Sequence, residues 1–366
     1  MALTTVRPQG MGFDTGRRNL VINGAMQVSQ RGTSSTGQTG SGYKNSPDRF
    51  RQSIGTAGTW TVSQSTDAPE GFSNSHKLDC TTANSSLSAA SDMVLQHRLE
   101  GQNLQMLKKG TSNAESVTVS FYVKSNKTGT YIFEMFDNDN SRRISKAYTV
   151  SSSDTWERKE ITIEGDTTGT LDNDNARSVT LQWWLVAGSD YTSGTLSTSW
   201  TASSGNTANR VVGQVNLADS TSNEWYITGV QMELGENASD FEHRSFGEEL
   251  ALCQRYYEKS YSSTTNPGTA TVDGIRHSSG AAGQTTTGEL PMGINFLTTK
   301  RSAPTITLYD SQGNSGKCSR VDFGITTHNN STASTNFVGE NAFMMSSSSG
   351  STGSGVHCHF VADAEL

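Results

Sequence analysis

Short segments in which apolar and polar residues alternate recur along most of this sequence, and they limit the chain to a mainly β fold. The segment 117–123, VTVSFYV, places valine and phenylalanine on one side of an extended chain and Thr, Ser and Tyr on the other. Gly, Asn, Asp and Ser, which favour turns, separate such segments. We therefore predict an antiparallel jelly-roll β-sandwich. Its strands are expected at 60–64, 93–99, 117–123, 131–136, 147–150, 160–163, 179–186, 211–217 and 225–234.

The composition indicates a folded chain with few charges. Only 32% of the 366 residues are hydrophobic, and 51 Ser and 46 Thr make up over a quarter of the sequence. Yet 13 Phe, 10 Tyr and 6 Trp supply enough bulk for a core. The net charge is −7 without a basic cluster, which argues against nucleic-acid binding.

The sequence carries no sign of a membrane segment or of a disulfide framework. It has no apolar run of 18 residues and no apolar stretch near residue 1 that would form a secretory signal. We therefore expect a protein that is not embedded in a membrane. The four cysteines are widely spaced, so we expect buried, reduced thiols in a protein that is assembled in a cytosol.

The pattern divides the chain into four parts. Residues 1–16 lack periodicity and are expected to be a docking peptide, and residues 17–245 form the predicted jelly roll. Ser245 and Glu248 have the spacing of a capping box, and an apolar stripe follows, so we predict a linking helix over 246–261. Residues 262–366 are predicted to form a smaller β-domain. Its strands are expected at 289–296, 305–309, 320–326, 342–346 and 357–362.

Three stretches of the sequence have specific motifs. Residues 18–32 read RNLVINGAMQVSQRG, with PDRF at 47–50; residues 225–235 read WYITGVQMELG; residues 241–259 read FEHRSFGEELALCQRYYEK. In this order they resemble a family of bacteriophage virion structural proteins, mostly tail fibres of short-tailed phages of marine bacteria. The region 17–260 is also similar to the jelly rolls of carbohydrate-binding modules. Asn23-Gly24 predicts a tight turn after a first strand, and Arg49 is expected to pair with a carboxylate on the edge of the sandwich.

The resemblance implies a function and partners. It implies a homotrimer in the virion, assembled in the host cytoplasm and placed in the tail, with residues 1–16 contacting other virion proteins. We expect a non-enzymatic tail fibre that attaches to a host surface glycan or an outer-membrane receptor through many weak, repeated contacts. Two alternatives stay open: a capsid decoration or head-fibre protein without a receptor role, and a glycan-degrading tail spike. No pair of carboxylates in the sequence stands out as catalytic.

Two sets of residues are candidates for binding. Sugars stack on aromatic rings, and the candidate glycan or receptor contacts are Tyr43, Trp184, Tyr191 and Trp200. Trp183 and Trp184 must point to opposite faces of their strand, which is why one of them is a candidate. The runs DNDN at 137–140 and 172–175 supply the oxygen ligands that calcium requires, but Asn and Asp also favour turns. The candidate calcium ligands are Asp137, Asp139, Asp172 and Asp174. No other cofactor is expected.

Overall fold

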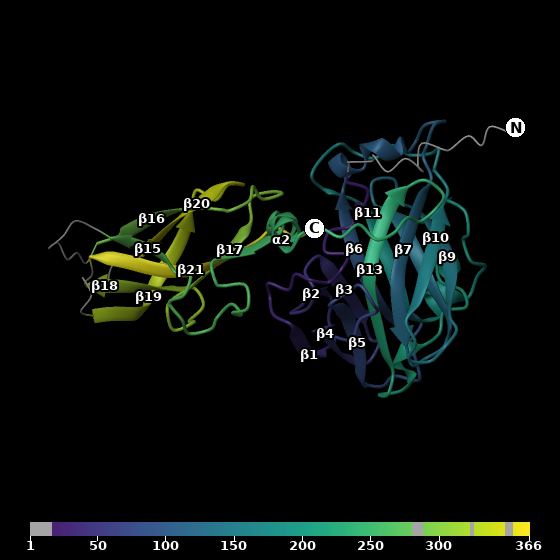
Figure 1. The fold of residues 1–366 in the computed structure, drawn as a ribbon, viewed down its shortest axis with the longest axis horizontal. Helices are drawn as coiled ribbons and strands as arrows, with labels where there is room; N and C mark the ends of the chain where they lie inside the picture. The colour runs from purple at the N-terminus through teal and green to yellow at the C-terminus, as the bar shows by residue number, and fades with distance from the viewer. Residues whose placement is uncertain (1–16, 280–287, 323–325, 348–353) are drawn as a thin grey trace, which may run out of the picture.

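The computed structural model describes residues 17–279, 288–322, 326–347 and 354–366. A two-layer β-sandwich and a smaller β unit lie end to end, with a short helix and the last residues of the sequence between them (Figure 1). The predicted mainly β, antiparallel class is confirmed. The predicted docking peptide, 1–16, lies outside the described residues. No helix in the described part of the chain is long and apolar enough to span a membrane.

Two antiparallel sheets form the sandwich. The six-stranded sheet has the order β1 (Ser34–Gln38), β4 (Thr59–Ser65), β5 (Ser75–Thr82), β13 (Glu224–Leu234), β7 (Val117–Ser125), β10 (Glu157–Ile163). The seven-stranded sheet has the order β12 (Thr201–Ala202), β9 (Arg142–Val150), β8 (Gly129–Asp137), β11 (Arg177–Ala187), β6 (Asp92–Glu100), β3 (Phe50–Gly55), β2 (Gly42–Tyr43). Short helical turns connect them: η2 (Gly101–Asn103), η3 (Gln105–Leu107), α1 (Ser189–Thr192), η4 (Thr207–Asn209) and η5 (Leu217–Asp219).

The sandwich core is made by one face of each sheet. Trp60, Phe121, Trp183 and Trp225 are fully buried in it. Trp184 follows Trp183 on β11 and therefore points to the outer face, where it packs against Val211 in a separate small cluster. The outer face of the seven-stranded sheet is thus partly covered by the segment 188–216, which joins β11 to β13.

The C-terminal unit is built around one long strand. Its sheet has the order β14 (Tyr257–Lys259), β21 (Gly355–Asp363), β18 (Lys317–Asp322), β19 (Thr326–Asn336), β20 (Ala342–Ser347), β16 (Leu290–Asn295). Two further strands, β15 (Arg276–Ser279) and β17 (Thr305–Tyr309), also pair with β21. Phe343, Phe360 and Cys358 lie in its core, and all four cysteines of the chain are buried and free.

The motif stretches meet in space around Asn23. Its backbone N–H donates to Glu249 Oε1 at 2.6 Å, and its amide Nδ2 donates to the carbonyl oxygens of Val28 (2.8 Å) and Asp48 (2.9 Å). A Cβ on Gly24 would lie 2.1 Å from the carbonyl oxygen of Val230, so only glycine allows β13 to approach this turn. The stretches 18–32, 47–50, 225–235 and 241–259 therefore form one structural unit.

Four local predictions were wrong. The helix α2 covers only Phe246–Gln254 rather than 246–261, because β14 begins at Tyr257 and pairs with β21. Ser245 does cap Glu248 N–H at 3.3 Å, but the Glu248 carboxylate pairs with Arg17 instead of reaching back. The predicted strand at 211–217 is a loop that runs into η5, and the described residues before the turn at Asn23-Gly24, 17–22, form no strand.

A buried ion pair holds the sandwich and the C-terminal unit together. Arg49, whose side chain is 0% exposed, forms an ion pair with Glu365 and stacks its guanidinium 3.4 Å over the Tyr256 ring. Its Nη2 donates to the carbonyl of Arg98 at 2.8 Å. The predicted carboxylate partner of Arg49 thus exists, but it comes from the last residues of the sequence rather than from the edge of the sandwich.

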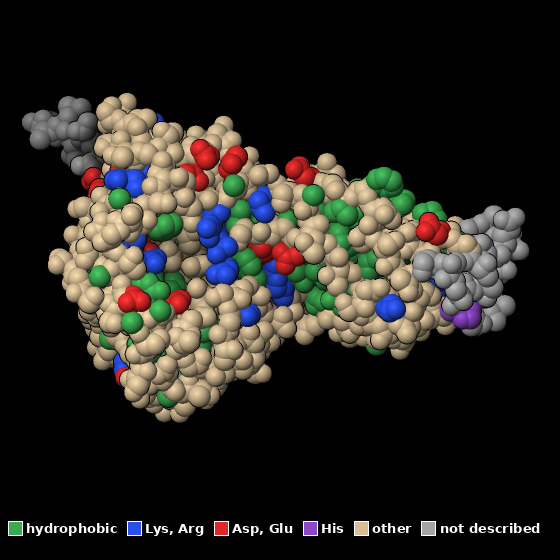
Figure 2. Space-filling view, turned by 180° about the vertical axis from the view of Figure 1, so that it is seen from behind, with side chains coloured by type: hydrophobic (Ala, Val, Ile, Leu, Met, Phe, Trp, Pro, Cys, Tyr) green, Lys and Arg blue, Asp and Glu red, His purple; other side chains and the backbone are tan. Residues whose placement is uncertain are grey.

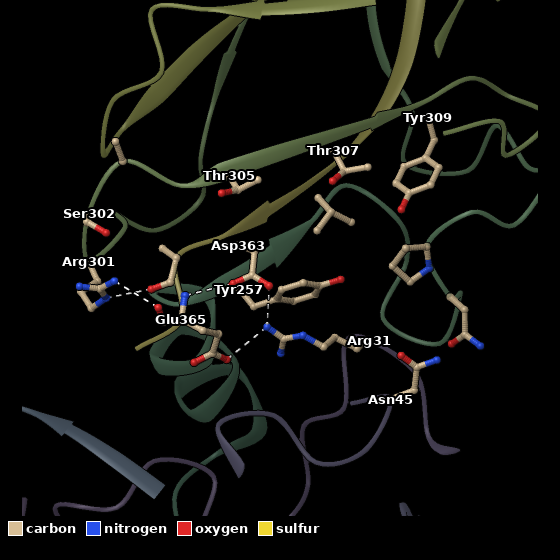
Figure 3. A pocket seen from close by; sticks show the side chains of 15 residues that line it. Arg31, Asn45, Tyr257, Arg301, Ser302, Thr305, Thr307, Tyr309, Asp363 and Glu365 are labelled. Atoms are coloured by element: carbon tan, nitrogen blue, oxygen red, sulfur yellow. Dashed lines mark hydrogen bonds and ion pairs between the residues drawn. The ribbon is translucent and has the colours of Figure 1, made fainter. Parts of the chain in front are cut away.

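Further contacts surround this pair. Arg255 forms a bidentate pair with Glu100, with both N···O distances at 2.8 Å. Arg31 lies 3.7 Å over the Tyr257 ring and reaches Asp363 and Glu365 (Figure 3). We call this set, Arg31, Arg49, Glu100, Arg255 and Glu365, the junction.

The junction predicts a loss of stability when Glu365 is removed. The change Glu365→Ala leaves the Arg49 guanidinium buried without its carboxylate, which should lower the free energy of unfolding by about 3–5 kcal/mol. The control Glu248→Ala removes an exposed pair with Arg17 and should change it by less than about 1 kcal/mol. Urea denaturation measures both values, and equal losses in the two variants would contradict a structural role for the junction.

Two buried histidines predict acid sensitivity. Burial lowers the pKa of His76 to about 3, and burial and Arg49 lower that of His97 well below its ordinary value. The neutral form is favoured in the fold, so its stabilisation is complete above the unfolded pKa of about 6.5 and is lost as the pH falls.

We expect the buried His76 to lower the free energy of unfolding by about 2 kcal/mol between pH 7 and pH 5. In His76→Gln, the decrease in the free energy of unfolding over this pH range should therefore be smaller by that amount. Exposed His243→Gln should leave the loss unchanged. Urea unfolding at the two pH values decides, and an identical pH dependence in wild type and His76→Gln would refute the assignment.

Candidate functional site

The most distinctive surface feature is a groove on the outer face of the seven-stranded sheet. It has a volume of about 380 Å³. The strands β6 and β11 supply its floor through Val94, Gln96, Thr180, Gln182 and Trp184. Every second residue of these strands faces outward, because the residues between them fill the sandwich core. The segment 188–216 adds a wall that includes Tyr191, Ser203 and Arg210.

Polar side chains form a continuous hydrogen-bonded row across the floor. Gln96 Nε2 donates to Gln182 Oε1 at 3.3 Å, and Gln182 Nε2 donates to Glu134 Oε1 at 3.0 Å. Glu134 is fully buried and accepts from Arg210 Nε at 3.0 Å and from its Nη2. This carboxylate raises the pKa of Arg210 against the opposing effect of burial. The row fixes the side-chain conformations of the groove floor before any ligand arrives.

Aromatic rings line one end of the groove. The rings of Trp184 and Tyr191 lie 5.2 Å apart at a 52° angle, and the Arg210 guanidinium lies 4.7 Å from the Trp184 ring. Trp184 Nε1 is buried without a hydrogen-bond partner in the described structure. Asp92 is at the same end, and burial raises its pKa. This end offers ring surface, an amide row and a carboxyl group to a ligand.

The structure brings together two of the four predicted glycan contacts. Trp184 and Tyr191 both line the groove, although Trp184 is only 2% exposed. Tyr43 lies instead beside the junction, where burial raises its pKa to about 12. Trp200 packs on the sandwich edge and donates from Nε1 to the Glu164 carbonyl at 2.7 Å. Neither Tyr43 nor Trp200 contributes to the groove.

Sequence reasoning missed the polar members of the groove. Gln96, Gln182, Arg143 and Arg210 were not predicted, because no short motif contains them. One signal for Gln182 was present in the sequence: the strand 177–187 has polar residues at alternate positions beside two tryptophans. In the structure nearly all of its residues are buried, on both faces. A strand whose two faces are covered would ordinarily be apolar throughout.

The candidate calcium ligands lie in two adjacent loops. Asp139 Oδ2 accepts the backbone N–H of Asp172 at 3.0 Å, and Asp172 and Asp174 are exposed. Asp137 is fully buried and binds Lys109 Nζ at 2.6 Å, so an ammonium group already neutralises it. Within the described ranges, no group of three or more His, Cys, Asp or Glu residues could hold a metal ion. Calcium binding at these residues stays a prediction.

A second, larger cavity of about 750 Å³ lies between the sandwich and the C-terminal unit. Its charged side chains serve the junction: Arg31 pairs with Asp363 and Glu365, and Arg301 donates to the carbonyls of Asn175 and Ala364 (Figure 3). Because Arg31 forms ion pairs and Arg301 forms hydrogen bonds to backbone carbonyls around the cavity, we assign it a role in joining the two units.

Comparisons with known proteins identify related folds without a related sequence. No protein-family model matches the chain, and no curated protein matches it. Similar solved structures include the enzymatically active domain of tailspike protein 4 of bacteriophage CBA120 (13% identity, TM-score 0.32), which covers 59% of this chain and 21% of that one. Another is a family 11 carbohydrate-binding module of Clostridium thermocellum with a mixed-linked tetrasaccharide (11% identity, TM-score 0.27, 58% and 99% covered).

A family 61 carbohydrate-binding module with β-1,4-galactotriose is similar to the same extent (9% identity, TM-score 0.29, 60% and 100% covered). This chain therefore spans about a fifth of the tailspike structure's length and nearly all of either module's. At such TM-scores, the likeness carries no information about the ligand of this chain.

Lys109 predicts a test of the acidic loop at 137–140. It is buried between Asp137 and Asp166, at 2.6 and 3.1 Å, so Lys109→Met leaves the buried Asp137 without its cation, whereas Asp166 keeps its ion pair with Arg142. We expect a loss of about 3–5 kcal/mol in the free energy of unfolding. The neighbouring Lys108→Met removes only an exposed pair with Glu115 and should cost less than about 1 kcal/mol. Urea denaturation compares the two variants, and equal stability would contradict this role of Lys109.

Proposed function

We propose that this protein is a non-enzymatic virion structural protein of a bacteriophage, of the tail-fibre type, that attaches to a glycan on the host surface. The observation that carries the glycan-binding part is the groove, in which an aromatic pair and a pre-ordered amide row lie side by side. Such a combination suits sugars, because ring faces pack on C–H surfaces and amides bond to hydroxyl groups.

The virion part of the proposal is supported by the motif stretches. They resemble phage tail fibres. In the structure they meet at the contact between Asn23 and Glu249, which lies on α2. Several copies on one particle would turn weak single-site binding into strong attachment by raising the effective concentration. A homotrimer belongs to this proposal. A capsid location is the alternative, and gold labelling of purified particles separates the two.

The absence of catalysis is also part of the proposal. Asp92 is the one carboxylic acid among the described residues that line the groove, because Glu134 is fully buried and is bound by both Arg210 and Gln182. Hydrolysis of a glycosidic bond ordinarily requires two carboxylic acids that flank it, and the groove lining supplies one. Incubation with host surface polysaccharide should therefore yield no new reducing ends. Their appearance would refute this part of the proposal.

The groove predicts that binding depends on Tyr191. We expect Tyr191→Ala to weaken the binding of host surface polysaccharide about tenfold, because it removes half of the aromatic pair while leaving the sandwich core intact. Isothermal titration calorimetry on the full chain measures the effect. The control is Phe337→Ala, which removes an aromatic ring that is 83% exposed on the C-terminal unit. If Phe337→Ala weakened binding and Tyr191→Ala did not, the glycan site would lie on the C-terminal unit.

A further inference from the structure

The groove also has an electrostatic property that aromatic residues do not explain. Arginines Arg51, Arg98, Arg143 and Arg177 lie on or next to its floor, and within the described ranges none of them forms an ion pair with an Asp or Glu side chain. By contrast, Arg210 in the same groove is paired with Glu134. Figure 2 shows Lys and Arg side chains gathered on the sandwich beside the C-terminal unit.

Strand pairing places these arginines in register. Arg143 on β9 pairs with Phe136 on β8, and Phe136 pairs with Thr180 on β11. Thr180 in turn pairs with Arg98 on β6. Two residues along, Gln182 pairs with Gln96, which pairs with Arg51 on β3. Gln96 Oε1 accepts from Arg51 Nη1 at 3.1 Å and from Arg98 Nη2 at 3.2 Å, so both guanidinium groups converge on one neutral oxygen. Arg98 also donates to an oxygen of Leu366.

Arg143 supplies an independent sign of a missing ligand. It is 3% exposed and lines the groove. Its Nη2 donates to the Ser203 carbonyl at 2.7 Å, while Nε and Nη1 are buried without any hydrogen-bond partner in the described structure. Unsatisfied buried donors are rare, and a charged one is costly. An acidic group of a ligand would pair with one of these nitrogens, because Nε and Nη1 donate from different edges of the guanidinium.

The neighbouring arginines add to this cost. Burial, together with the charges of Arg51 and Arg177, lowers the pKa of Arg98 to about 10. The pKa of Arg143 is lowered by burial and by Arg210. In each case the charged form is disfavoured by the surroundings. A negative group placed among them would reverse that effect.

We propose that the groove binds an anionic polysaccharide, with its acidic groups held by Arg143 and Arg177 and a sugar ring packed on Tyr191, which the buried Trp184 supports. This inference rests on the proposed function and specifies its ligand class. Guanidinium groups bind carboxylates and sulfate esters bidentately, which sets them apart from the single charge of a lysine. Thr180 and Trp184 are four residues apart on β11, or about 13 Å, so the arginine and aromatic ends suit different parts of one oligosaccharide.

The test uses the full chain and three defined probes: polygalacturonate for carboxylates, dextran sulfate for sulfate esters, and neutral dextran. Affinity electrophoresis should show retardation by at least one acidic probe, none by dextran, and weaker retardation as NaCl rises from 50 to 500 mM. We expect Arg177→Gln and Arg143→Gln each to weaken binding of the acidic probe about tenfold. Arg177 is exposed, so its variant should fold even if the Arg143 variant does not.

The matched control is Arg158→Gln, on β10 of the opposite sheet, which should bind like wild type. One result would overturn the anionic ligand and leave the proposed function standing. In that result, neutral dextran or host polysaccharide binds in a way that depends on Tyr191, and neither arginine variant weakens the binding. If the acidic probes, dextran and host polysaccharide all fail to bind, both proposals are wrong. Equal weakening by Arg158→Gln would mean non-specific charge attraction, which also overturns the site.

Discussion

The sandwich depends on the alternation of side chains along β11. Trp183 fills the space between the two sheets, where it contacts Phe50, Phe121 and Phe133. The next residue, Trp184, is thereby turned to the outer face, together with Gln182 and Thr180. A core that needs one tryptophan thus places another on the outer face beside a polar row, where the segment 188–216 covers it. The groove is a consequence of this packing.

Much of the fold could be predicted from the alternation alone. Predicted strands at 117–123, 131–136 and 305–309 correspond to β7, β8 and β17 because their apolar residues face a core at every second position. Two polar strands were not predicted: β1, which reads SSTGQ, and β5, which reads SHKLDCTT. β1 pairs with β4, and β5 pairs with β4 and β13; this pairing determines their structure more than their composition does. The helix was overextended because Tyr257 continues its apolar stripe but is claimed by β21.

The site was less predictable than the fold. Aromatic residues in polar surroundings pointed to Trp184 and Tyr191, which line the groove, and also to Tyr43 and Trp200, which do not. A ring beside glycine and serine can equally pack on a neighbouring unit or a sheet edge. Arg143 and Arg177 are 34 positions apart, and only the paired register of β9, β8 and β11 brings their strands together. Side chains that meet through long-range pairing leave no local trace in a sequence.

The buried pair of Arg49 and Glu365 also bears on how the chain matures as it leaves the ribosome. The two residues are separated by 316 positions. The Arg49 guanidinium therefore lacks its counter-charge until 316 further residues have been synthesised, while the strands around it can already associate. Fragments released before that point would lack the contacts of the C-terminal unit, and incompletely packed chains of this kind are the ones on which chaperones and proteases act.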